Sequence, residues 1–508
     1  MARQQSFNYD NLGKGINSFT RDTMITEKET ADASNVWSVG KNSLAKRPGY
    51  RLACEVAGVD QIDGMGSYYT ASATELLIMA GGKLYKNVSG VATQIDTDTW
   101  TSGERADFCQ AGGKMFISNG TNNLREYNGS TITDTTNGKV GRFAIFYKGS
   151  LFIAGDPSYP TRLYRSGSGD KLGDFTYNET DNPLATSIFV GKDDGQSITG
   201  LFKHQDYLYI AKERSIYRVG QSTDEAGTLS LELVDPGRGV QSHWTIDTVE
   251  NDIFFFDDVG VFAFGYEPNI LDQIRTNIVS LRVDPKIKAI QKSRLSEVAG
   301  FFYDNHYYLS YTSGGGGSND KTLVYDRQRL SWWEFNIGAN CYTEFKDSGG
   351  YSYLYFGSST NGKVYYYDET AKNDDGEVIE SFWKSPKYSF KDYVQQKYFH
   401  FVILYFGNSR NTLTVKLYVD GKLHKTESIR LGGTSTGGIG TQIIGQDQIG
   451  VSGGSGSEQT SEKHAISINK IGSNFSLIIS DEGDNKTWEL NAIEGVISPL
   501  TKLYVKTN

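Results

Sequence analysis

Cysteine, proline and long hydrophobic runs are scarce in this sequence of 508 residues. Its three cysteines, Cys54, Cys109 and Cys341, stand alone without a CxxC spacing, so neither a disulfide framework nor a zinc site is predicted. Six histidines are scattered singly, without an HExxH or HxH pair. No apolar run approaches the roughly 18 residues of a membrane-spanning helix. The start MARQQSFNYDN lacks an apolar core, so we expect neither a secretion signal nor a membrane-spanning segment.

Basic clusters are missing as well. The formal net charge is −9, and no run of lysine and arginine is long enough to form a basic arm. Tight, sequence-independent binding to DNA is therefore not expected. An acidic surface suits ordinary solubility, and it also suits a conduit through which DNA slides without sticking.

Catalytic and cofactor motifs are not found either. Residues 357–363 satisfy the phosphate-binding P-loop pattern, but Val364 stands where a serine or threonine must reach magnesium. The residues that follow read as a strand, so we interpret this motif as a hairpin turn. No GxSxG elbow with local support from its surroundings appears. We expect no cofactor and no enzyme activity, although two carboxylates from separate strands can meet at a propeller axis, as in a glycosidase.

Aromatic residues and glycine are abundant instead, with 32 Tyr, 26 Phe and 57 Gly, and they favour short strands joined by tight turns. A module of an alternating strand, a polar turn, a very apolar second strand and a third strand occurs seven times. The apolar second strands are LLIMA (76–80), MFISN (115–119), LFIAG (151–155), YLYIA (207–211), IFFFD (253–257), YYLSY (307–311) and YLYFG (353–357).

Each second strand is followed by a third strand that carries Tyr, Phe or Leu. A sheet of about 40 residues cannot bury both of its faces alone, so such units must stack. Radial stacking closes the array and leaves only short edges, whereas solenoid coils are shorter than these modules. The sequence therefore predicts an all-β protein with a β-propeller of about seven blades. Because an outer strand can be exchanged between the first and last blades, six, seven and eight blades all remain open.

The propeller is predicted over residues 51–376, with an N-terminal arm before it. Within this arm, residues 1–50, a capping-box pattern at Thr26 to Glu29 predicts a short helix through about Trp37. Ile and Leu at helical spacing predict a helical insertion at 268–297, either a cap over one propeller face or a contact to a neighbouring subunit.

Longer alternating strands after residue 376 predict a β-sandwich over 377–508, at 395–407, 412–431, 464–472, 475–482 and 502–508. Asp420-Gly421 is a hairpin turn signal between two of them. The segment 431–458 is too rich in Gly and Ser to pack a core, so we expect a flexible insertion there.

Residues 11–50 resemble the N-terminal arm of the tail nozzle (tail tubular) and packaged-DNA stabilisation proteins of short-tailed bacteriophages. The resemblance rests on Gly15-Ile16-Asn17, on the acidic stretch 27–33, and on two short motifs, Asn35-Val36-Trp37 and Lys46-Arg47-Pro48-Gly49. GGKLYK (81–86), the insertion after the fifth module, and LVYDRQRLSWWEF (323–335) add to it.

This resemblance implies a virion protein of the phage tail, made in the bacterial host cytoplasm. It would form a homohexameric ring below the portal and adaptor proteins, continue the channel for double-stranded DNA, retain packaged DNA and open for ejection. The arm would dock to adjoining subunits or to the adaptor through Asn35, Trp37, Arg47, Pro48 and Gly49. Two alternatives remain, a carbohydrate-binding or glycosidase-like propeller and an intracellular protein-interaction propeller.

Overall fold

The computed structural model describes residues 4–500 except 72, 96–98, 221–228, 267–273, 348, 391, 393, 408, 410, 433–461, 482 and 484–485. It divides the chain into two compact units. One unit contains Tyr50–Gln328 and Asn336–Asp368, and the other contains Met1–Gly49, Arg329–Phe335 and Glu369–Asn508. No helix among the described residues has both the length and the apolar character that crossing a membrane requires.

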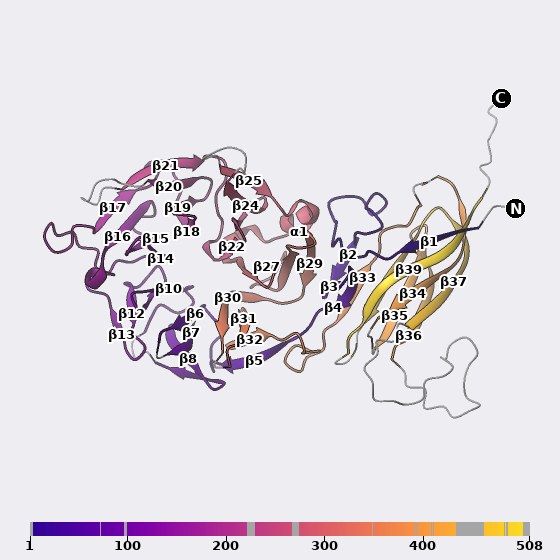
Figure 1. Ribbon diagram of the computed structural model, residues 1–508, viewed down its shortest axis with the longest axis horizontal. Coiled ribbons are helices and arrows are strands. Elements are labelled where there is room, and N and C mark those ends of the chain that lie inside the picture. Colours follow the sequence, from indigo (N-terminus) through magenta and orange to yellow (C-terminus); the bar gives the residue numbers. More distant parts are fainter. Residues whose placement is uncertain are drawn as a thin grey trace. The chain divides into compact units, whose positions relative to one another are not determined.

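The first unit is a β-propeller of seven antiparallel sheets. Its innermost strands are arranged around a common centre (Figure 1). In chain order they are β6 (Gly64–Tyr69), β10 (Asp107–Ala111), β14 (Phe143–Tyr147), β18 (Ile198–His204), β22 (Asp247–Val249), β26 (Ala299–Tyr303) and β30 (Ala339–Lys346). Strand β30 of the last blade neighbours β6 of the first, so the ring of blades is closed.

All seven predicted second strands are confirmed as the second strands of the blades. They are β7 (Thr74–Ala80), β11 (Lys114–Ser118), β15 (Ser150–Ala154), β19 (Tyr207–Lys212), β23 (Asp252–Asp257), β27 (His306–Tyr311) and β31 (Ser352–Ser358). Every residue of β15 is buried. Continuous burial follows from the position between neighbouring blades, because both faces of such a strand are covered.

The third strands are confirmed as well, and each pairs with the second strand of its own blade. They are β8 (Lys83–Val88), β12 (Arg125–Tyr127), β16 (Arg162–Ser168), β20 (Ile216–Gly220), β24 (Gly260–Tyr266), β28 (Lys321–Asp326) and β32 (Lys363–Tyr367). The P-loop-like motif at 357–364 is the hairpin between β31 and β32, as predicted.

Outer strands complete the sheets, and one of them decides the blade count. Four blades end in β9 (Val91–Gln94), β13 (Ile132–Asp134), β17 (Thr186–Phe189) and β21 (Ser230–Asp235). The outer strand of the last blade is β5 (Tyr50–Glu55), which precedes the first blade in the sequence and pairs with β32. This exchange between the two chain ends of the propeller gives seven blades.

The predicted helical insertion at 268–297 is wrong at residues 274–278. Residues 267–273 lie outside the described residues, and Ile274–Ile278 form β25, the outer strand of the fifth blade, which pairs with β24. Residues 274–278 pair with the edge of β24 that β23 leaves open, and they form the fourth strand of this sheet. Helical turns follow at Leu281–Val283 (η3), Asp284–Lys288 (α1) and Lys292–Glu297 (η4).

The second unit is a β-sandwich of two sheets. One sheet has the order β3 (Val36–Val39), β4 (Ser43–Lys46), β39 (Glu489–Pro499), β34 (Lys397–Phe406) and β37 (Glu462–Gly472), with β1 (Gln5–Tyr9) paired to β39. The other has the order β2 (Asp32–Ser34), β33 (Ser381–Lys384), β38 (Phe475–Asp481), β35 (Thr412–Val419) and β36 (Lys422–Arg430). Phe399 and Phe475 from opposite sheets meet edge to face, 5.4 Å apart.

The segment before the propeller is built into both sheets of the sandwich. It supplies β1, β3 and β4 to one sheet and β2 to the other. The predicted helix from Thr26 to Trp37 is wrong. The Glu29 carboxylate accepts the Thr26 backbone N–H at 2.9 Å, as a capping box requires, but the backbone of Thr30 pairs with Gly15 and Asn17. This pairing takes the backbone groups that a helix would need.

The predicted sandwich strands at 395–407, 412–431, 464–472 and 475–482 correspond to β34 to β38. Asp420 and Gly421 both have positive φ, 48° and 77°, as the hairpin turn between β35 and β36 requires. Strand β39 was missed by the sequence pattern, because a register shift near Ala492 breaks its alternation. The predicted strand at 502–508 and residues 433–458 of the Gly/Ser-rich insertion lie outside the described residues.

Candidate functional site

The residues predicted to dock a partner lie together in the sandwich unit, and Asn35 and Arg47 form their centre. Asn35 has φ +55° and is buried. Its Oδ1 accepts a hydrogen bond from Nε of Arg47 at 2.9 Å. Its side-chain NH2 group donates a hydrogen bond to the backbone carbonyl of Glu380 at 2.7 Å. Arg47 in turn forms a bidentate pair with Asp374, at 2.8 and 2.5 Å. These bonds give both residues a structural role in holding the segment before the propeller.

Gly49, Pro48 and Trp37 complete this group. An added Cβ at Gly49 would lie 1.7 Å from the carbonyl oxygen of Asn373, so only glycine fits. Trp37 packs edge to face on Phe335, with ring centroids 6.0 Å apart. Pro48 and Trp37 are half-buried, whereas Gly49 is buried. Docking to a partner thus stays a prediction for the group, with Trp37 and Pro48 as its accessible members.

The propeller unit holds a cavity of about 400 Å³ at its axis. Most of its lining residues belong to the innermost strands β6, β10, β22, β26 and β30, and others come from β11 and from the turn at 243–246. Its wall mixes apolar and polar side chains. The side chains among them are Met65, Ser67, Asp107, Phe108, Gln110, Met115, His243, Trp244, Ile246, Asp247, Phe301, Cys341, Tyr342 and Thr343.

Two carboxylates of this cavity, Asp107 and Asp247, occupy the first position of their innermost strands and bond in the same way. One oxygen of each accepts the N–H of the following residue, and the other accepts an N–H from the next blade. The next-blade donors are Ala144, at 2.8 Å from Asp107, and Phe302, at 2.6 Å from Asp247. Both carboxylates therefore fasten neighbouring blades to each other.

Charge in the cavity is only partly compensated. His243 Nε2 lies 3.3 Å from Oδ2 of Asp107. Burial raises the pKa of Asp247 to about 6, although its backbone hydrogen bonds act in the opposite direction. Burial also raises the pKa of the Cys341 thiol to about 12, so this cysteine is a neutral thiol at pH 7 and a poor nucleophile.

Arg105, just before β10, contacts residues of three other blades. Its Nε and Nη2 donate to Oδ1 of Asn340, and Nη2 also donates to the carbonyl of Glu297. Its guanidinium carbon lies 5.0 Å from the centre of the Trp244 ring. Burial lowers the pKa of Arg105 to about 10. Because Asn340, Glu297 and Trp244 lie near the start of innermost elements of three further blades, this side chain braces that end of the axis.

This arrangement fits bracing better than general acid–base catalysis. Each carboxylate of the cavity accepts two backbone N–H groups, one of them from the next blade, which gives both aspartates a structural role. Across the part of the chain that is described, no three His, Cys, Asp or Glu side chains cluster to hold a metal. Trp332 and Trp333 are fully buried in the sandwich unit, so neither ring is available to stack on a sugar or a base.

Sequence reasoning missed the residues that brace the axis. Arg105 carries no motif, since its partners are 192 and 235 residues away in the chain. Asp107 and Asp247 did leave a signal, because each is the first residue of the innermost strand of its module. The other five innermost strands begin with other residues, so this signal is not common to the modules.

Fold and site together define a seven-bladed β-propeller joined to a β-sandwich that the two ends of the chain build. No protein-family model matches this chain. No curated protein matches it either.

Solved structures with propeller folds are similar at low identity. BamB from Moraxella catarrhalis is 12% identical with a TM-score of 0.37, covering 67% of this chain and 97% of its own. YCF48 bound to D1 peptide is 11% identical with a TM-score of 0.39, and the match covers 63% of this chain and 97% of that chain. The WD40 propeller domain of Doa1 is 10% identical with a TM-score of 0.39, and the match covers 63% of this chain and 97% of that chain. At this level the similarity concerns the fold alone.

Proposed function

We propose that this chain is a structural component of a bacteriophage tail, a nozzle or connector protein that assembles as a ring below the portal. In this role it continues the DNA channel, retains packaged DNA and opens for ejection, without catalysis. The resemblance of residues 11–50 and 323–335 to the tail nozzle proteins is the origin of the proposal.

One structural observation supports this proposal. Two of the resembling segments, far apart in sequence, bond to each other in the sandwich unit. The backbone N–H of Ile16 donates to the carbonyl of Trp332 at 2.9 Å, and that of Asn35 donates to the carbonyl of Glu334, also at 2.9 Å. The Arg47 guanidinium lies over the ring of Phe335 at 5.5 Å. Matching segments that form one folded element support a shared architecture more than short motifs do alone.

The bracing of the axis favours this proposal over the glycosidase-like alternative. In a glycosidase, one carboxyl group protonates the leaving group and the other acts as base or nucleophile. Asp107 and Asp247 instead hold backbone groups of neighbouring blades. The protein-interaction alternative predicts a monomer that stays monomeric.

Measurement of mass tests the proposal directly. We expect the purified protein to form a ring, by itself or after addition of the portal and adaptor proteins of its phage, visible as a hexamer in native mass spectrometry and electron microscopy. A protein that remains monomeric alone and with these components would overturn the proposal.

The docking prediction needs its own experiment, because deletion of residues 1–50 would remove four strands of the sandwich. A photoreactive amino acid at Lys41, an exposed residue in the turn between β3 and β4, keeps the fold intact. Crosslinks from this position to a second copy or to the adaptor are expected within assembled particles. The same substitution at Lys422, exposed in the β35–β36 hairpin, is the control.

A further inference from the structure

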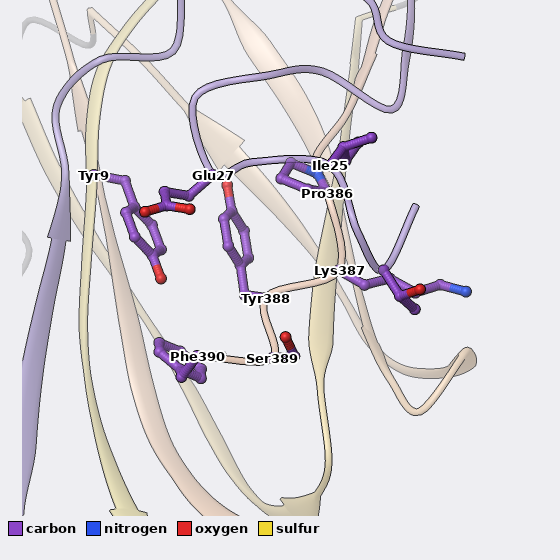
Figure 2. Close-up of a pocket in the computed structure, with 9 residues that line it drawn as sticks. Tyr9, Ile25, Glu27, Pro386, Lys387, Tyr388, Ser389 and Phe390 are labelled. Atoms are coloured by element: carbon purple, nitrogen blue, oxygen red, sulfur yellow. The ribbon is translucent and has the colours of Figure 1, made fainter. Parts of the chain in front are cut away.

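The sandwich unit holds a second cavity, of about 260 Å³, formed by three segments of the chain (Figure 2). Strand β1 contributes Tyr9, the turn before β2 contributes Thr23, Ile25 and Glu27, and the segment after β33 contributes residues 386–390. Pockets that bury drug-sized ligands span about 300–1,000 Å³. This smaller cavity suits a single side chain or a small molecule.

Backbone hydrogen bonds hold the three segments in place. The N–H of Tyr388 donates to the carbonyl of Phe475 at 2.8 Å, which attaches the wall to β38. The N–H of Lys387 donates to the carbonyl of Asp22 at 3.1 Å and joins two of the segments. Tyr9 is the last residue of β1, which pairs with β39. The pocket is therefore preformed, so a ligand would not have to order it.

Two aromatic rings form one wall of the pocket. Tyr9 and Tyr388 are stacked, with ring centroids 4.8 Å apart and an angle of 14° between the planes. The Tyr388 side chain is 3% exposed, and its hydroxyl makes no hydrogen bond of ordinary geometry among the described residues, although the Ser385 side chain lies close to it. A buried hydroxyl without a well-formed hydrogen bond is unfavourable, and a ligand atom that bonds to it would relieve this.

Glu27 supplies the charge of the pocket. Its carboxylate has neither a hydrogen bond nor an ion pair within the described part of the chain, and it lies at the same end of the pocket as the Tyr388 hydroxyl (Figure 2). Lys387, the other charged residue of the lining, points away from the Glu27 carboxylate (Figure 2). Burial first, and then the negative charge of Glu27, raises the pKa of Tyr9, so this tyrosine stays neutral beside the carboxylate.

We propose that this pocket binds a primary ammonium group on an alkyl chain, as in a lysine side chain or a linear diamine. The ammonium donates hydrogen bonds to the Glu27 carboxylate and to the Tyr388 hydroxyl oxygen, which becomes an acceptor. The methylene chain contacts apolar residues of the lining, among which are Ile25, Pro386 and Phe390. A neutral ligand would leave Glu27 uncompensated, and an anion would be repelled.

The test uses the full-length protein and saturation-transfer NMR. Nα-acetyl-lysine methylamide is the probe, and Nα-acetyl-norleucine methylamide, with a chain of similar length but no charge, is the comparator. We expect transfer to the lysine analogue and little to norleucine. Equal transfer to both, or none to the lysine analogue at millimolar concentration, would overturn the proposal.

Two substitutions locate the binding. Glu27→Gln keeps the shape and removes the charge, so the lysine signal should fall at least about tenfold, as loss of a charged hydrogen bond worth about 1.5–3 kcal/mol predicts. Tyr388→Phe should weaken binding about fivefold through loss of one acceptor. Glu179→Gln, at an exposed glutamate of the propeller unit, is the matched control and should change nothing. Undiminished binding by Glu27→Gln would contradict the assignment.

Competition separates the two sources of the ammonium group. If 1,5-diaminopentane displaces the lysine analogue at lower concentration than the analogue's own dissociation constant, the site takes a free diamine. If a lysine-containing peptide is the stronger competitor, the ammonium group comes from a protein chain.

Discussion

The hydroxyl of Tyr303 donates a hydrogen bond of 2.7 Å to the backbone carbonyl of Ser352 on the next blade. Tyr303 is the last residue of innermost strand β26, and Ser352 begins the second strand of the seventh blade. Tyr147, the last residue of β14, makes the same kind of bond to the carbonyl of Asp206 at 2.6 Å. Tyrosines at the ends of innermost strands thus connect neighbouring blades.

Tyr303→Phe is expected to lower the free energy of unfolding of the propeller by about 1 kcal/mol, the usual worth of one hydrogen bond. Urea unfolding followed by fluorescence measures it. Tyr351→Phe is the control, because that side chain is 68% exposed and should give a change within about 0.5 kcal/mol. Equal effects of the two substitutions would contradict a connecting role for Tyr303.

Arg47→Lys is expected to destabilise the sandwich unit by at least about 1.5 kcal/mol. Lysine cannot make the bidentate pair with Asp374 and the bond to Asn35 at the same time, and part of the buried network would lose its donors. Thermal unfolding provides the measurement. Lys288→Arg, at an exposed ion pair with Asp284, should leave the transition unchanged.

Gly49→Ala is expected to prevent correct folding or to destabilise the protein by more than about 3 kcal/mol, because the new Cβ meets the backbone of Asn373, which cannot move aside easily. Soluble yield and melting temperature measure the outcome. Gly317→Ala is the matched control, since nothing lies within 4 Å of the added carbon. A variant Gly49→Ala that folds and melts like the original protein would show that the close approach to Asn373 is absent.

The raised pKa of Asp247 leads us to expect that the stability of the propeller depends on pH. Its folded pKa of about 6 lies above the ordinary value of about 4, so the folded state binds the proton more tightly than the unfolded state. This contribution to stability is present below about pH 4 and is lost as the pH rises through about 6. Relative to Asp247→Asn, the original protein should gain on the order of 2 kcal/mol between pH 7 and pH 4.

Chemical unfolding at several pH values measures this difference. Asp60→Asn, at an exposed aspartate, should give a difference that does not vary in this way. A constant difference for Asp247→Asn across the range would mean that its carboxyl group titrates normally.

The modules could be read from the sequence because their signals are local. A second strand covered on both faces needs an unbroken apolar run, and a tight hairpin needs residues that accept positive φ, as at Lys148-Gly149 and Asp304-Asn305. Neither requirement depends on a residue outside the hairpin.

The capping box shows where local reading fails. Glu29 does bond to the backbone of Thr26, yet the chain turns into strands β2 and β3 instead of a helix. Backbone pairing with residues 15 and 17, and with β33 for β2, outweighs a cap that is worth about 1 kcal/mol. Backbone pairing also outweighs the local helical pattern at 274–278, because these residues pair with the free edge of β24.

The sequence by itself determined the repeating hairpins, their apolar middle strands and the strand-rich C-terminal part, since spacing and turn chemistry act over a few residues. Only the tertiary structure decided that β5 closes the seventh blade, that residues 1–49 belong to the sandwich, and that Arg105 and Arg47 bind partners more than 190 residues away. These choices depend on which strand edges and buried charges remain unsatisfied once the hairpins have formed, and that is a property of the assembled chain.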